Sequence, residues 1–93
     1  MSRPLLTDAD RGDVFRGLAH PLRRRVLRML GRGERSVSEL LSGLDVTMPS
    51  LSRHLAVLRD AGLVTQRIAG PRRYYRRNAP ALRRARRWLL QNT

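Results

Sequence analysis

The chain has 93 residues, enough for one small domain, and its hydrophobic content of 41% excludes wholesale disorder. Its 20 basic residues, all arginine, stand against 7 acidic ones and give a net charge of +13. A compact domain with this imbalance attracts polyanions, so nucleic acid is the leading partner and an anionic membrane surface the second. The absence of cysteine excludes disulfides, thiolate metal sites and cysteine nucleophiles.

Nothing in the sequence indicates export or a membrane span. The first ten residues lack the apolar run of a signal peptide, and no stretch approaches the ~20 apolar residues that a spanning helix needs. We therefore expect one domain over residues 1–93, located in the cytoplasm near the nucleoid, with no membrane partner.

Two helices are predicted in the first third of the chain. Residues 1–6 are typical of a flexible arm, and Thr7 with Asp10 forms a capping-box pattern that would open the first helix. His20 and Pro21 mark a break, after which proline suits the first position of a second helix. One face of that helix is apolar and is formed by Leu22, Val26, Met29 and Leu30.

Residues 36–61 have the spacing of a helix-turn-helix. Ser36 with Glu39 is a capping box that opens a short third helix, which stops at Gly43. The fourth helix is predicted over residues 48–60. At 100° per residue, Leu55 and Leu58 lie within about 40° of Leu51, and the three leucines form its buried stripe.

The opposite face of residues 48–60 is small, polar or basic, and it has no acidic residue before Asp60. A helix surface that enters a DNA groove about 12 Å wide needs such a profile. We therefore expect it to be the recognition helix. The candidate DNA-reading residues on and beside it are Thr47, Pro49, Ser50, Ser52, Arg53 and His54.

A β-hairpin, or wing, is predicted over residues 63–77, where two strand-like runs flank Gly70 and Pro71. Basic side chains cluster at its tip and could follow the DNA backbone or enter the minor groove. The candidate DNA contacts of the wing are Arg67, Arg72, Arg73 and Arg76. A last helix over residues 79–91 completes a mainly α fold with a small hairpin: four helices, two strands and one helix, a winged helix-turn-helix.

Large apolar side chains at the two ends of the chain exceed what a 93-residue core needs. Either the terminal helices pack only on their own subunit, or they form a two-fold homodimer, which we favour. Such a dimer would present two recognition helices about 34 Å apart to an inverted repeat. The candidate interface residues are Phe15, Leu18, Leu82, Ala85, Trp88 and Leu89.

Three runs, VFRGLAHPLRRRVLRML, SVSELL and SLSRHLAVLRDAGLV, followed by a wing that contains YY, resemble the ArsR-type winged helix-turn-helix transcriptional regulators. The resemblance covers roughly residues 13–78. It implies a homodimer, built largely from the first and last helices, that binds an operator and usually represses. The positions that match the family's DNA-reading residues are Ser50, Ser52, Arg53 and His54.

The chain departs from the metal-sensing branch of this family. Leu41 and Gly43 stand where the two thiolates of the ELCVCDL-like motif would be, and the last helix has no His, Asp or Glu. His20 replaces a frequent aspartate and is interpreted as a helix-start residue. His54 either contacts DNA or packs at the helix–turn junction. We expect no metal and no cofactor. Release from DNA could follow a small molecule, a partner protein or simple titration, or the protein has no effector.

The function that these patterns favour is a sequence-specific DNA-binding transcriptional regulator, most simply a homodimeric repressor. The alternative is a protein that coats DNA or RNA without sequence preference, which the charge alone would support. An enzyme is disfavoured because the sequence shows no nucleophile–base pair, no phosphate-binding loop and no paired carboxylates.

Overall fold

The computed structural model describes the backbone of residues 8–92 and the side chains of residues 12–92. The predicted arm, residues 1–6, and the predicted capping box of Thr7 and Asp10 lie outside these. The elements in chain order are α1 (Asp8–Leu18), α2 (Pro21–Leu30), β1 (Glu34–Ser36), α3 (Val37–Ser42), α4 (Met48–Asp60), β2 (Val64–Ala69), β3 (Arg72–Arg77) and α5 (Ala79–Gln91).

The core is built around the leucine stripe of α4. Leu51, Leu55 and Leu58 are almost completely buried, as the helical period predicts. Burying one leucine side chain contributes about 1.5–3 kcal/mol, so this stripe fixes which face of α4 looks outward. The buried residues that it joins from other elements include Val26, Leu27, Leu30, Leu40, Leu63 and Tyr75.

Strands β2 and β3 form the predicted β-hairpin, which is confirmed. Strand β1, which was not predicted, extends the wing to a three-stranded antiparallel sheet in the order β1-β3-β2. The third strand, β1, has three residues, and Arg35 of β1 stands opposite Tyr75 of β3. A strand this short has no alternating pattern of its own. Its partner β3 follows almost 40 residues later, which explains why local sequence signals miss it.

The end of α4 is tightly joined to the start of the wing. Gly62 has a φ of 74°, a left-handed conformation that glycine adopts without steric cost. The Gly62 and Leu63 N–H groups donate to the Arg59 and Leu58 carbonyls, each at 2.9 Å. This pair of bonds satisfies the last carbonyls of α4 and aims the chain directly into β2.

Asn78 connects three elements. Its side-chain Nδ2 donates to the Gly62 carbonyl at 2.8 Å, and its backbone N–H donates to the Leu63 carbonyl at 2.9 Å. Its Oδ1 accepts from the Ala81 N–H at 3.3 Å and so caps α5. The end of α4, the end of β3 and the start of α5 are therefore held by one residue.

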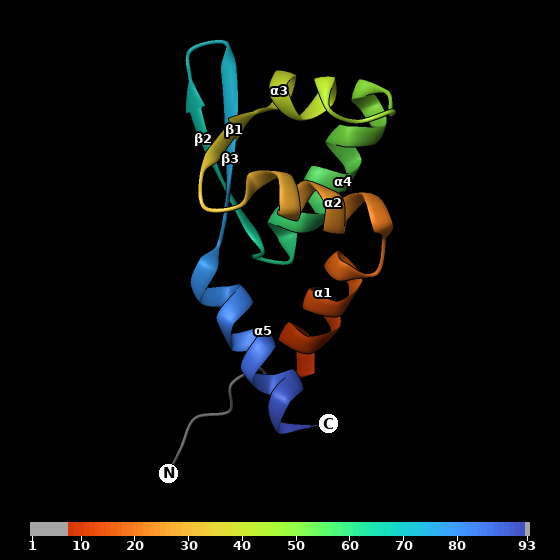
Figure 1. Cartoon of the computed structure of the whole chain (residues 1–93), viewed down its shortest axis with the longest axis vertical. Coiled ribbons are helices and arrows are strands. Elements are labelled where there is room, and N and C mark those ends of the chain that lie inside the picture. The colour runs from red at the N-terminus through yellow and green to blue at the C-terminus, as the bar shows by residue number, and fades with distance from the viewer. Residues whose placement is uncertain (1–7, 93) are drawn as a thin grey trace.

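The molecule is elongated, with extents of 46 × 25 × 20 Å. Figure 1 shows α1 and α5 at one end, and α3, the start of α4 and the tip of the wing at the other. This order of elements and the arrangement of α3, α4 and the sheet confirm the predicted winged helix-turn-helix fold.

Ser36 closes the predicted capping box of α3. Its Oγ accepts from the Glu39 N–H, and Glu39 Oε1 accepts from the Ser36 N–H, both at 3.1 Å. We expect Ser36→Ala to lower the free energy of unfolding by about 1 kcal/mol, because it removes the acceptor of an orphan N–H. Urea denaturation measures this. Ser38→Ala is the matched control, because Ser38 lies two residues further along in α3 and is exposed. It should leave the urea midpoint unchanged.

Candidate nucleic-acid interface

The outward face of α4 begins with its cap. Thr47 is exposed, and its Oγ1 accepts from the Ser50 N–H at 3.3 Å, so this hydroxyl caps the start of α4. Pro49 lies in the first turn, as predicted, and Ser50 is half-buried. Ser52 and Arg53 are exposed, and within residues 12–92 no hydrogen bond or ion pair holds either side chain.

His54 belongs to a cluster that joins α4 to the loop between α1 and α2. Its Nδ1 lies 3.1 Å from Nη1 of Arg23, and because a guanidinium only donates, Nδ1 is the acceptor. The centroids of its ring and of the His20 ring are 4.4 Å apart. His54 is half-buried and packs at the helix–turn junction, the second of the two roles considered for it.

His20 and Arg23 extend this cluster into the backbone. His20 Nδ1 accepts from the Leu22 N–H at 3.0 Å, which confirms His20 as the residue that starts α2. Arg23 donates to the carbonyls of Arg16 at 2.6 Å and Gly17 at 3.0 Å. The guanidinium thus ties the end of α1 to α4.

The four arginines predicted to act in the wing divide into two groups. Arg72, Arg73 and Arg76 are exposed, and no hydrogen bond or ion pair engages their side chains in the part of the chain that the structure describes. Arg67 instead binds Glu34 of β1 through both Nε, at 3.0 Å, and Nη2, at 2.6 Å. Its guanidinium also lies 4.4 Å from the centre of the Tyr74 ring.

This contact changes the expected role of Arg67. The hydrogen bond from Arg67 lowers the pKa of Glu34, so the pair remains ionised at neutral pH. Arg67 spans β3 and connects the two outer strands, β1 and β2. It therefore holds the wing together, while Arg72 and Arg73 beside the tip remain available to an outside partner.

A link between α4 and the wing is not visible in the sequence pattern. Gln66 Oε1 accepts from Arg59 Nη1 at 2.8 Å and from the Tyr75 hydroxyl at 3.2 Å. The three groups come from α4, β2 and β3. They connect α4 to the wing, a role that the spacing of these residues does not indicate.

Some of the candidate dimer residues pack within their own chain, and others are exposed. Phe15 and Trp88 pack against each other within one chain, with ring centroids 5.4 Å apart and planes at 62°. Ala85 is only 3% exposed and already belongs to the core of its own chain, which leaves it almost no surface to offer a partner. Leu89 is 41% exposed, and Leu90, which sequence reasoning missed, is 67% exposed.

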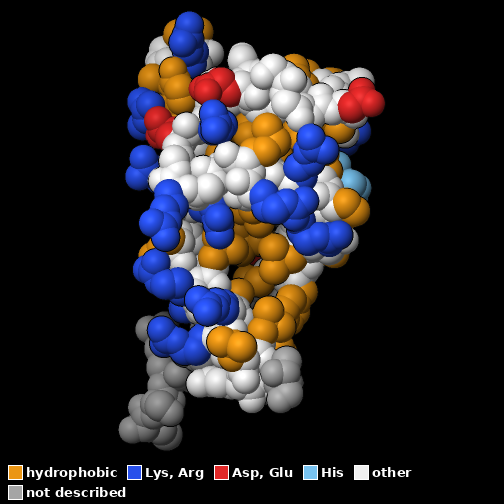
Figure 2. Space-filling model, in the orientation of Figure 1, with side chains coloured by type: hydrophobic (Ala, Val, Ile, Leu, Met, Phe, Trp, Pro, Cys, Tyr) orange, Lys and Arg blue, Asp and Glu red, His pale blue; other side chains and the backbone are white. Residues whose placement is uncertain are grey.

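A groove runs along α5 beside these residues and has a volume of about 660 Å³. Figure 2 shows hydrophobic side chains in this hollow and arginine on its rim. The predicted interface residues that line it are Leu18, Leu82, Ala85 and Leu89, and the arginines are Arg32, Arg76, Arg77, Arg83 and Arg86.

Two other kinds of site are absent from the described residues. No three His, Asp or Glu side chains among them gather closely enough to hold a metal ion. None of the described helices combines the length and apolar character required to cross a membrane.

His54 predicts a pH dependence of stability. Burial, followed by the charges of His20, Arg23 and Arg53, lowers its pKa below the usual 6.5. The unfolded chain therefore takes up the proton first, so the stabilisation is complete above pH 6.5 and is lost as the pH falls through the folded-state pKa. Thermal unfolding should show a lower melting temperature at about pH 5.5 than at about pH 7.5. His54→Gln should flatten this difference; an equally steep difference in that variant would assign it to other groups.

Comparison with known proteins gives the family. Residues 18–67 match the family model described as a helix-turn-helix domain. The biofilm growth-associated repressor of Agrobacterium fabrum is 43% identical over 63 residues, 68% of this chain and 54% of that protein. The arsenic resistance transcriptional regulator ArsR1 of Pseudomonas putida is 44% identical over 64 residues, 68% of this chain and 50% of that protein. The chain thus spans about half the length of these two curated relatives.

A solved structure extends the similarity over most of the fold. The ArsR-like transcriptional regulator from Rhodococcus sp. RHA1 is 31% identical, with a TM-score of 0.79 over 89% of this chain and 78% of that one. The matched helix-turn-helix, the wing and the shared fold together show that the chain belongs to the ArsR-type family of winged helix-turn-helix transcriptional regulators.

Proposed function

We propose that this protein is a sequence-specific DNA-binding repressor that acts as a homodimer on an inverted-repeat operator in the cytoplasm. The observation that carries the proposal is the outward face of α4. Its leucine stripe is buried, so Ser52 and Arg53 are exposed to solvent. The start of α4 and the tip of the wing lie at the same end of the molecule (Figure 1). Small polar side chains and arginine are suited to reading base edges in the major groove.

The wing supplies the second part of the proposed interface. Arg72 and Arg73 carry charges that no acidic side chain neutralises among the described residues. Contacts from such arginines to phosphate position a protein on the duplex but carry no direct sequence information. We assign Arg53 to base reading and Arg72 to backbone binding. The other proposed contacts of this surface are Thr47, Pro49, Ser50, Ser52 and His54 on and beside α4, with Arg73 of the wing. Arg76 lines the groove along α5 instead.

The groove along α5 supports the dimer. Leu18, Leu82 and Leu89 line an open apolar hollow that one chain leaves unfilled, and Leu90 adds exposed apolar surface beside it. The T-shaped contact of Phe15 with Trp88 makes α1 and α5 one packed unit. Two such units packed across a two-fold axis would bury the groove and present two copies of α4 to successive major grooves.

The first test separates base reading from backbone binding. Arg53→Ala should cost roughly 1–3 kcal/mol on a selected operator and relax the preference for it over random duplex DNA. Arg72→Ala should weaken binding to both DNAs alike. Fluorescence anisotropy at one salt concentration measures both affinities. Arg28→Ala, which removes an exposed arginine of α2, controls for the loss of one charge and should have the smallest effect.

The same measurement distinguishes a sequence-specific regulator from a protein that coats nucleic acid without selectivity. A regulator should bind its operator about 10³-fold or more tightly than random DNA. The net charge of +13 would also allow non-selective coating of DNA or RNA. A ratio near one for the wild-type protein, with both arginine variants losing affinity equally on every duplex, would establish coating instead.

The second test concerns the dimer. Leu89→Asp places a carboxylate in the apolar groove and should shift the protein from dimer to monomer, because a buried unpaired charge is costly. Sedimentation velocity at micromolar concentration measures the change. Ile68→Asp alters a side chain that is more exposed, at 65%, but lies on the wing, and it should remain dimeric. Equal dissociation in both variants, or none in either, would place the interface elsewhere.

A further inference from the structure

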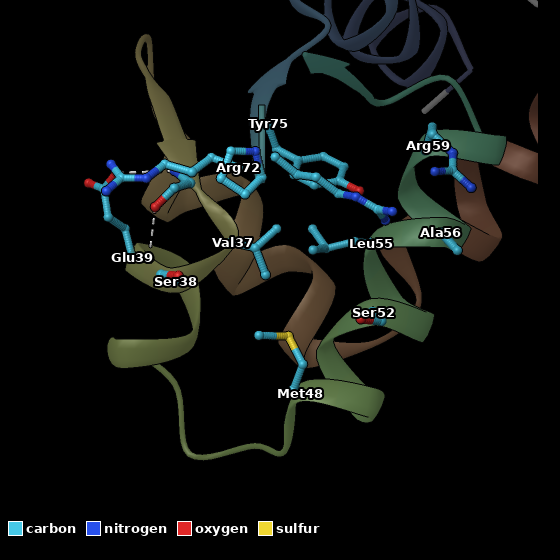
Figure 3. Close-up of a pocket in the computed structure, with 13 residues that line it drawn as sticks. Val37, Ser38, Glu39, Met48, Ser52, Leu55, Ala56, Arg59, Arg72 and Tyr75 are labelled. Atoms are coloured by element: carbon cyan, nitrogen blue, oxygen red, sulfur yellow. Dashed lines mark hydrogen bonds between the residues drawn. The ribbon is translucent and has the colours of Figure 1, made fainter. Parts of the chain in front are cut away.

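A second hollow opens between α3, α4 and the wing and has a volume of about 770 Å³. We call it the wing cavity (Figure 3). This volume falls within the range of about 300–1,000 Å³ that small-molecule sites occupy. The residues that form its walls include Val37, Met48, Ser52, Leu55, Arg59, Arg72 and Tyr75.

One wall of the wing cavity is apolar. Figure 3 shows Val37 of α3, with Met48 and Leu55 of α4, pointing toward one another below the Tyr75 ring. Leu55 is 2% exposed and Tyr75 is 4% exposed, so both form a fixed floor. Met48 is 42% exposed and forms the open side. A thioether side chain in that position can adjust to apolar groups of different shape.

The polar wall is strongly basic. Arg59, Arg72 and Arg73 line it, and Glu39 is the one carboxylate among its lining residues. That carboxylate is already engaged: Oε1 accepts from the Ser36 N–H at 3.1 Å, and Oε2 lies 3.5 Å from Arg35 Nη1. Arg59 is partly engaged, because its Nη1 donates to Gln66 at 2.8 Å and its Nε lies 3.9 Å from Asp60 Oδ1. Arg72 and Arg73 have no acidic partner among the described residues, so the charge that remains for a ligand is positive. An apolar floor beside arginine forks suits a molecule that has an apolar body and a carboxylate.

We propose that the wing cavity binds a small amphipathic carboxylate, with its acid group on Arg59 and Arg72 and its apolar part against Val37, Met48 and Leu55. Ser52 and Arg72 line the cavity and also belong to the proposed DNA surface. An occupied cavity therefore competes with DNA. The competition rests on the proposed function, whereas the binding of the carboxylate stands independently of it.

Binding is tested first without DNA, with decanoate as the probe and the full chain in isothermal titration calorimetry. We expect saturable binding of one decanoate per chain and none of decylammonium, which has the same apolar tail and the opposite charge. Val37→Phe fills the cavity, and Arg59→Gln removes a cation outside the proposed DNA contacts. Each should weaken decanoate binding about tenfold.

Matched controls keep this test specific. Ile68→Phe adds the same ring on β2, and Arg28→Gln removes an arginine of α2; both side chains are exposed and lie outside the cavity lining. Both controls should bind decanoate as the wild-type protein does. If decanoate does not bind saturably, or if both cavity variants bind it as tightly as the controls, the cavity is not its site and the proposal is overturned.

Competition is tested second, by anisotropy on a selected operator. Saturating decanoate should raise the apparent Kd for DNA in the wild-type protein and in Arg28→Gln, but much less in Val37→Phe. An unchanged Kd at saturation would overturn the competition. A wild-type protein that binds decanoate at the cavity and shows no DNA binding would contradict the proposed function and leave the ligand site standing.

Discussion

The burial of one leucine stripe controls the rest of this structure. Leu51, Leu55 and Leu58 leave almost no surface exposed, and together they commit one side of α4 to the core. A rotation of the helix by half a turn would expose this stripe and bury Arg53, which costs far more than any surface contact returns. The outward face of α4 is therefore set by the core and is already formed before a partner arrives.

The excess of arginine does not act uniformly. With few carboxylates available, several guanidinium groups bind backbone carbonyls instead. Arg23 and Arg24 of α2 donate to the carbonyls of Arg16, Gly17 and Leu18, which are the last groups of α1. Helices leave such carbonyls without partners inside the helix. Arginine here completes a helix end, so part of the positive charge is structural and only the rest is offered to a polyanion.

The helices and the outward face of α4 could be predicted because their signals are local. The period of the leucine stripe, the box of Ser36 with Glu39, and the proline after Ala79 each lie within a few residues of what they determine. The features that escaped prediction all join distant segments. Glu34 meets Arg67 across 33 residues and His54 meets Arg23 across 31. No spacing in the sequence shows such pairs, and they decide which candidate side chains remain available.

The contacts of Asn78 would limit which half-site spacings the proposed dimer can bind. One side chain holds the end of α4 and caps α5, so the angle between the two helices depends on it. Over half of the 46 Å long axis, a rotation of about 10° at this joint would displace the far end by about 4 Å, slightly more than the rise of ~3.4 Å per base pair. The rigidity of a single amide would thus determine whether two half-sites one base pair farther apart still fit the same protein.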